Sequence, residues 1–277
     1  MEKLLRLFLS GCLVLTVLSC KKENIILDET ERRASAMEIF QSGLYFPQGS
    51  PKSMTQIALA VDVDSTYAEA LREYSVAYLK RGLPHKWKVW MDKAVYHDAK
   101  TWQPWRGYLY LWFYRDYQKA IEDFNASDTL TPNFIDQPQG HSVDFWRGIA
   151  YLGLKDYKNS ISYWDKHISK ETEEAGEDWV EIEAFLYRGI AYYESGEKTK
   201  AIENFNKIIE YFKSSADAKF YLAKIHLESG EKQTALLLIE DAIADFNAGY
   251  FNQRPYVEAL RQIYMEDLIH LKSEIMD

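Results

Sequence analysis

The sequence predicts an all-α protein, an α-solenoid of stacked helical hairpins closed by a C-terminal helix. An internal repeat is the main evidence. Trp105-Arg106-Gly107 returns as Trp146-Arg147-Gly148 and as Tyr187-Arg188-Gly189, and a tyrosine follows three residues after each glycine. The glycines stand 41 residues apart, a period typical of supersecondary units that stack because none can bury its apolar face alone. Apolar residues at helical spacing on both sides of each turn are the second observation.

The first 20 residues predict export. Lys3 and Arg6 precede an apolar run from Leu7 to Leu18, which is too short to span a bilayer but fits the h-region of a signal peptide. The run ends at Leu18-Ser19-Cys20, which resembles the cleavage site of a bacterial lipoprotein. We therefore expect a signal peptide over residues 1–19 and lipid attachment at Cys20. Cys12 is a second candidate, although cleavage there would leave apolar residues on the mature chain, and an ordinary cleaved signal is a third reading.

Composition limits how the folded part can be stabilised and which class of partner it can bind. The only two cysteines lie within the first 20 residues, so packing rather than disulfides must stabilise the folded part. The net charge is −9, and no cluster of Lys and Arg is present that would neutralise phosphates, so we expect no nucleic-acid partner. Residues 20–33 are polar and charged and are interpreted as a tether.

The repeated residues resemble the tetratricopeptide repeat (TPR), a helical hairpin of 34 residues. The resemblance rests on Arg188-Gly189-Ile190-Ala191-Tyr192 in a first helix and on Ala201-Ile202 with Phe205 in a second, with partial copies in other units. It implies about six hairpins over residues 34–249, the first one faint. The units are expected to start near Ala34, Ala68, Lys100, His141, Ile182 and Ala216, with extra residues at two joints, 135–140 and 169–178.

The small and large residues of each unit predict how its two helices pack. Gly148, Gly189 and Ala201 are small where the two helices of a hairpin cross, and Phe124 and Phe205 fill the space between neighbouring units. Residues 250–277 are expected to cap the open end of the stack, with a helix from Tyr256 to about Ile275 that Pro255 would start.

Two charged features each have two readings. Arg106, Arg147 and Arg188 either form an anion-binding ladder or pair within their own hairpins, as Arg106 with Asp123, and we favour the second. The acidic stretch from Glu171 to Glu183 either holds a cation or is a solvated insertion with its later acids at a helix N-terminus, and we again favour the second because it lacks the order of a calcium loop.

Catalytic motifs are not found in the sequence. The six histidines are scattered without metal-ligand spacing, and neither a glycine-rich phosphate loop nor a nucleophile elbow is present. We therefore expect no enzyme activity, no catalytic residues, no metal site and no cofactor.

The binding surface is expected on the concave face, which the resemblance places along the first helices. Transferring that stripe predicts an apolar and aromatic groove. The extra residue in the turn after Trp112 leaves its register open by one position there. The groove would suit an extended peptide, a partner helix or a glycan. For Trp87, Trp90 and Trp105 we favour filling of joints over ligand binding. The candidate groove residues are Tyr108, Trp112, Phe145, Ile149, Ile190, Tyr193 and Lys224.

Lys21-Lys22-Glu23, which follow the cysteine, resemble the surface-export signal of Bacteroidetes-type lipoproteins. Together these resemblances imply a non-catalytic lipoprotein of a bacterial cell envelope of the Bacteroidetes type. It would be anchored to the outer membrane by its N-terminal lipid, on the periplasmic or the surface side, and would bind a protein or peptide partner. Two alternatives stay open: a structural component of an outer-membrane assembly machine, and a surface lipoprotein that captures glycans.

Overall fold

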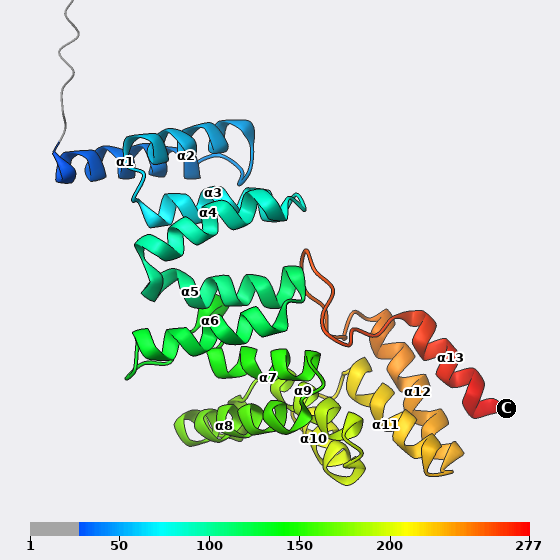
Figure 1. Cartoon of the computed structure of the whole chain (residues 1–277). Helices are drawn as coiled ribbons and strands as arrows, with labels where there is room; N and C mark the ends of the chain where they lie inside the picture. Colours follow the sequence, from blue (N-terminus) through cyan, green and yellow to red (C-terminus); the bar gives the residue numbers. More distant parts are fainter. Residues whose placement is uncertain (1–27) are drawn as a thin grey trace, which may run out of the picture.

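A computed structural model describes residues 28–277 of the chain, so the predictions for the signal peptide and for Cys20 lie outside the described residues. The described part folds into helical hairpins that stack one on the next into a curved array (Figure 1). The six hairpins and the last helix are α1 (Glu29–Leu44) with α2 (Pro51–Val63), α3 (Ala68–Leu79) with α4 (Pro84–His97), α5 (Ala99–Leu109) with α6 (Tyr117–Leu130), α7 (Val143–Gly153) with α8 (Tyr157–Ala175), α9 (Ile182–Glu194) with α10 (Lys198–Tyr211), α11 (Ala216–Glu228) with α12 (Lys232–Asn247), and α13 (Met265–Met276). The predicted all-α solenoid is confirmed.

The predicted units agree with the hairpins except at the N-terminal end. Five of the six units start within two residues of the expected positions, but the first helix begins at Glu29 and not near Ala34. Residues 29–33 are therefore helical rather than part of a tether. Asp28 caps the helix by accepting from the Glu31 N–H at 2.8 Å, and Arg33 pairs with Asp64 of the same hairpin at 2.5 Å. These two contacts stabilise a polar first turn that composition alone marks as a linker.

Close helix crossings explain the repeated glycines. A Cβ atom added at Gly189 would lie 2.6 Å from the ring of Phe205 on the facing helix, and one at Gly148 would lie 2.5 Å from the ring of Trp164. Ala201 at the same seam is fully buried. The predicted close-contact positions are confirmed, and any larger residue there would push the two helices of a hairpin apart.

The hairpin of α5 and α6 absorbs its extra residue in a π-helical turn. This turn, η1 (Tyr110–Tyr114), extends α5 and ends at Arg115, whose φ of 54° lies in the left-handed region. The Asp116 N–H then donates to the Tyr110 carbonyl at 3.1 Å. Since a π-turn holds one more residue than an α-turn, α5 and α6 keep the crossing of the other units.

The two joints with extra residues differ from each other. Residues 138–140 form a 3₁₀ turn, η2 (Pro138–Gly140), whose Pro138 carbonyl accepts from the indole N–H of Trp146 at 2.9 Å. The second insertion mainly lengthens α8 to 19 residues, and a second 3₁₀ turn, η3 (Glu177–Trp179), precedes α9. The second insertion leaves α7 packed against α9, whereas η2 of the first packs against α5.

The C-terminal region differs from the prediction. The helix expected from Tyr256 to Ile275 is wrong in its first part, because α13 begins only at Met265 and residues 250–264 are not helical. Tyr256 and Arg261 have φ values of 70° and 58°, which end any helical path there. The cap of α13 is Tyr264, whose N–H donates to Asp267 Oδ2 at 2.8 Å. We call residues 250–264 the return segment, since Figure 1 shows this stretch running from α12 back toward α5 before it reaches α13.

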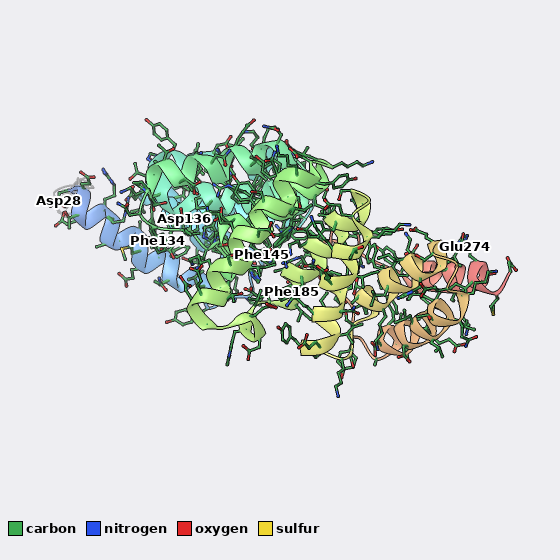
Figure 2. The ribbon with its side chains drawn as sticks, turned by 90° about the horizontal axis from the view of Figure 1, so that it is seen from below. Asp28, Phe134, Asp136, Phe145, Phe185 and Glu274 are labelled. Carbon is green, nitrogen blue, oxygen red and sulfur yellow. The ribbon has the colours of Figure 1, made fainter. Side chains whose placement is uncertain are left out.

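One hydrophobic core runs from α3 to α13, and a smaller cluster joins α1, α2, α3 and α4. Seen along the array, Phe145 and Phe185 lie inside it, whereas Asp28 and Glu274 mark its two ends (Figure 2). Large aromatics fill the core, among them Trp87, Trp112, Trp146 and Trp164. In residues 28–277 no helix is both long and apolar enough to cross a bilayer.

Candidate functional site

The face formed by the first helices of the hairpins is occupied by the chain itself. We call this face the A-helix groove and define it by Trp112 of η1, Trp146 of α7, Tyr187 of α9 and Asp217 of α11. The return segment lies on it and contacts side chains that are 35 to 71 residues away in the sequence. The groove therefore holds a non-helical stretch of polypeptide, which bends at residues 255–257 and turns at 260–261.

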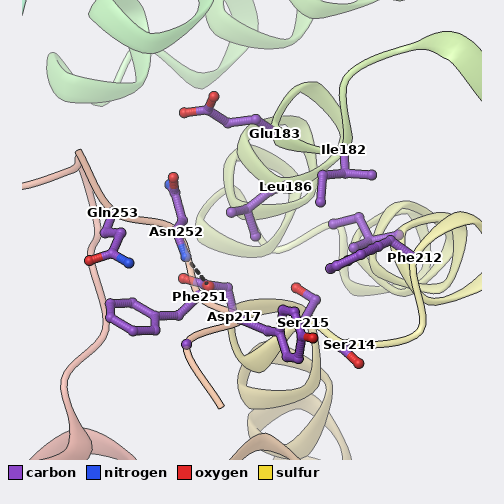
Figure 3. A pocket seen from close by; sticks show the side chains of 13 residues that line it. Ile182, Glu183, Leu186, Phe212, Ser214, Ser215, Asp217, Phe251, Asn252 and Gln253 are labelled. Atoms are coloured by element: carbon purple, nitrogen blue, oxygen red, sulfur yellow. Dashed lines mark hydrogen bonds between the residues drawn. The ribbon is translucent and has the colours of Figure 1, made fainter. Parts of the chain in front are cut away.

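The first anchor of the return segment is Asn252. Its backbone N–H donates to Asp217 Oδ2 at 2.7 Å, and its side-chain amide donates to the Tyr187 hydroxyl at 3.0 Å. Beside it, the Ala216 N–H donates to the Tyr250 carbonyl at 2.9 Å. Figure 3 shows Asn252 reaching down to Asp217, with Glu183 and Leu186 of α9 on the other side. The groove thus contacts both the backbone and the side chain of Asn252.

Arg254 is the central anchor. Its guanidinium lies over the ring of Trp112, 4.2 Å from the centroid, and over Trp146 at 5.0 Å, and it donates to both oxygens of Glu183 at 3.0 and 3.2 Å. The side chains of Arg254 and Glu183 are only 15% and 21% exposed. A desolvated cation–π contact contributes about 2 kcal/mol, and a carboxylate facing a guanidinium adds directional hydrogen bonds.

Arg261 holds the far end of the return segment. It donates to both carboxylate oxygens of Glu194, at 2.6 and 2.9 Å, at the C-terminal end of α9. Arg115 in turn donates to the Glu258 carbonyl of the segment. Ala259, Leu260 and Ile263 are buried between these polar contacts. Both arginines of the segment are therefore matched by acids of α9.

Asp217 is the most perturbed acid of the groove. Burial raises its pKa from 3.8 to about 7, and the N–H groups that it accepts from offset only part of the cost of holding a charge there. The carboxyl borders a cavity of about 320 Å³ between α9, α11 and the return segment (Figure 3). At neutral pH the groove therefore contains a carboxyl group close to its titration midpoint.

The open end of the groove is cationic. A cavity of about 330 Å³ lies where the return segment turns back beside α3 and α5. No carboxylate of the described residues lines it, although the chain is acidic overall. Its charged and aromatic lining residues are Arg72, Lys80, Arg254, Trp105, Tyr108, Phe113 and Tyr256.

The predicted groove residues divide into two groups. Trp112, Phe145, Ile149 and Ile190 are at most 1% exposed, so the expectation of an accessible stripe is wrong for these four. Trp112 lies beneath Arg254, and Phe145 packs edge-on against Trp164 inside the array with a ring-centroid distance of 4.8 Å.

The other three predicted residues stay partly accessible. Tyr108 packs edge-on against Trp146, with ring centroids 5.1 Å apart, and borders the cationic cavity. The Tyr193 hydroxyl donates to Glu228 at 2.5 Å, and Lys224 lies over the Tyr193 ring at 5.3 Å. Their role in binding stays a prediction.

Sequence reasoning missed the acids of the groove, Glu183, Glu194 and Asp217. Glu183 and Asp217 stand in the first turns of α9 and α11, where acids commonly stabilise a helix N-terminus, and Glu194 is the last residue of α9. The available signal in the sequence is the pair of arginines in residues 250–264, the region expected to form the capping helix.

The repeated arginines are structural, as favoured. Arg106 pairs with Asp123 of its own hairpin at 2.7 Å and with Asp92 of the preceding one at 2.9 Å. Arg147, which is 1% exposed, binds Asp144 at 2.7 Å and Asp128 of the preceding hairpin at 2.6 Å. Arg188 repeats the arrangement between α8 and α10. No free anion-binding ladder remains.

The acidic stretch is used for internal pairing. Glu181 lies 3.2 Å from both His141 and His167, and these contacts hold the pKa of Glu181 well below its usual range. Glu177 pairs with Lys207. Among residues 28–277, no three His, Cys, Asp or Glu side chains are arranged to hold a metal ion.

The tryptophans pack as favoured. Trp87 is buried, Trp90 lies edge-on to Tyr74 with centroids 5.0 Å apart, and Arg72 lies over both Trp102 and Trp105.

Residues 186–250 match the sequence profile of the tetratricopeptide repeat. This chain is folded as tetratricopeptide repeats. The TPR array is similar to solved structures at low sequence identity. A tetratricopeptide repeat protein from Parabacteroides merdae has a TM-score of 0.51 at 15% identity, over 93% of this chain and 88% of that one.

Two further structures share the fold. PilW, described as a type IV pilus biogenesis factor, has a TM-score of 0.60 at 14% identity, over 88% of this chain and 99% of its own. YrrB, described as a TPR protein with an unusual peptide-binding site, has a TM-score of 0.53 at 16% identity, over 78% and 97% of the two chains. No curated protein matches this sequence.

Proposed function

We propose that this TPR protein is a non-catalytic scaffold of a bacterial cell envelope that binds an extended segment of a partner protein in its A-helix groove. One observation carries the proposal: the groove already holds a non-helical stretch of polypeptide through a backbone hydrogen bond, an arginine stacked on two tryptophans and two acid–arginine pairs. These are the contacts by which proteins commonly bind extended peptides. The peptide-binding site named for YrrB is consistent with this use of the fold.

The charged groups support a scaffold rather than an enzyme. Outside the groove, the buried charged groups Asp64, Asp123, Asp144 and Arg147 are all engaged in ion pairs. A group held in a structural pair is poorly placed to transfer a proton or attack a substrate. Glycan capture has less support, because Trp112 and Trp87 are buried and Arg72 covers Trp105.

The lipid anchor at Cys20 is part of the proposal. Cys20 precedes the start of α1 at Glu29 by nine residues, which reach about 30 Å at most when fully extended. The first hairpin would then stay within roughly 30 Å of the membrane surface.

Photo-crosslinking in native membranes tests the proposed function. A photoreactive amino acid replaces Tyr108 or Tyr193, at the rim of the groove, or Glu203, on an exposed face of α10. We expect one protein to be captured from the two groove positions and not from Glu203. Capture from Glu203 alone would place the partner on the outer face. No capture from any position would contradict a protein-binding role.

A further inference from the structure

We infer that the return segment is a displaceable occupant of the A-helix groove, and that the partner which replaces it is an extended segment carrying two arginine side chains. The inference rests on the proposed function and names the chemistry of its partner. It depends on three features: the charges of the groove, the packing of the return segment and the independent docking of α13.

The charges of the groove define what fits. Glu183 and Glu194 hold Arg254 and Arg261 of the return segment, and Asp217 accepts a backbone N–H. If the segment left, these three acids would lie along one face of α9 and α11 beside Trp112 and Trp146. Such a face attracts cations, and a guanidinium both pairs with a carboxylate and stacks on an indole.

The spacing of the acids restricts the partner further. Glu183 and Glu194 are 11 residues apart on α9, which is about 16 Å along a helix. An extended chain covers that distance in roughly five residues. In the return segment the two arginines are seven residues apart, and the chain between them is shortened by bends at residues 255–257 and a turn at 260–261. A partner with arginines five to seven residues apart would match both acids.

The return segment is incompletely packed in the groove. Cavities of about 320 and 330 Å³ flank it, and the Nε of Arg254 and the indole N–H of Trp112 are buried without a hydrogen-bond partner. Its two non-glycine residues with positive φ carry backbone strain. A permanent cap would be expected to fill these spaces and satisfy these groups.

The helix after the return segment is held separately. Leu268, Leu271 and Ile275 of α13 are buried, and Lys272 pairs with Glu240 of α12 at 2.8 Å. The return segment can therefore leave the groove as a loop while α12 and α13 stay in place. Because it remains tethered at both ends, a partner must compete with a high local concentration of the segment.

The test uses the full chain in detergent and a dye-labelled synthetic peptide of residues 250–264 as the probe. In the variant Arg254→Ala/Arg261→Ala the segment is weakened in place, and we expect the peptide to bind at least tenfold more tightly than to the unchanged chain. Adding Glu183→Gln/Glu194→Gln should weaken this binding at least tenfold, as should replacing both arginines of the peptide by glutamine. Lys158→Ala/Lys232→Ala, two exposed cations outside the groove, is the matched control and should bind like the unchanged chain.

Several results would overturn the inference. One is a folded Arg254→Ala/Arg261→Ala variant that fails to bind the peptide. A second is a dimer that exchanges return segments, because the occupant would then be a second copy. If the Arg254→Ala/Arg261→Ala variant does not fold, hydrogen exchange on the unchanged chain tests whether the return segment leaves the groove. We expect the amides of residues 251–264 to exchange at least 100-fold faster than those of α9, and exchange only on global unfolding would refute displacement.

The outcomes separate this inference from the proposed function. Capture of a partner at Tyr108 together with a failed peptide test leaves the scaffold role intact and removes the displacement. A successful peptide test without any captured partner would support the displacement and contradict the scaffold role.

Discussion

Replacing the buried Asp217 by asparagine should change how the stability of the array depends on pH. In the folded chain the pKa of Asp217 is raised from 3.8 to about 7 by burial. A raised pKa means that the folded state prefers the protonated carboxyl. Its contribution to stability is therefore fully present below pH 4 and is lost as the pH rises through 7. At about 1.4 kcal/mol per unit over about three units, the loss is on the order of 4 kcal/mol by pH 8.

Asparagine keeps an oxygen that can accept the Asn252 N–H but carries no charge. We therefore expect Asp217→Asn to be close to the unchanged chain at pH 4 and more stable at pH 8 by a few kcal/mol, within the order of magnitude above. The assay is chemical unfolding followed by circular dichroism at unit steps from pH 4 to 8. Asp241→Asn, at an exposed position, is the control and should run parallel to the unchanged chain. Parallel curves for Asp217→Asn as well would refute the reasoning.

Three further predictions use the same fold. Gly189→Leu should lower stability by about 1–3 kcal/mol by forcing α9 from α10, whereas Lys198→Leu at an exposed position should change it by about 0.5 kcal/mol at most; equal melting temperatures would contradict the packing. Trp112→Ala should cost about 3–5 kcal/mol, because its ring is buried beneath Arg254, and an unchanged unfolding midpoint would show the ring to be dispensable. Cys20→Ala should release the protein from the membrane while Cys12→Ala should not, and fractionation with a labelled fatty acid would settle the attachment site.

The array could be predicted from the sequence because its packing repeats. Gly189 against Phe205 and Gly148 against Trp164 are local contacts within one hairpin, so small and large residues recur at fixed spacing and record them. The arginine pairs follow the same rule, since Arg106 reaches Asp123 only 17 residues away. Short-range contacts leave a periodic trace in the chain.

The contacts of the candidate site do not recur with the period of the hairpins. Arg254 meets Glu183 across 71 residues and Asn252 meets Tyr187 across 65, and neither pair follows the repeat. Local pattern favoured a helix after Pro255, but the tertiary contacts of the return segment outweighed that preference. Trp112 and Phe145 were placed on the right helices, and their burial depended on partners that periodicity does not reveal. The unusual proton affinity of Asp217 likewise comes from enclosure by distant parts of the chain.

The arginine pairs between hairpins have a mechanical consequence. Arg106, Arg147 and Arg188 each bridge their own hairpin to the second helix of the one before, through Asp92, Asp128 and Asp165. Each planar guanidinium fixes the angle between two neighbouring units, so the middle of the array should resist twisting and stretching as a single stiff rod. The outer hairpins have no arginine in this position. A force applied between the membrane and a bound partner would therefore unfold the outer hairpins first and the central hairpins last.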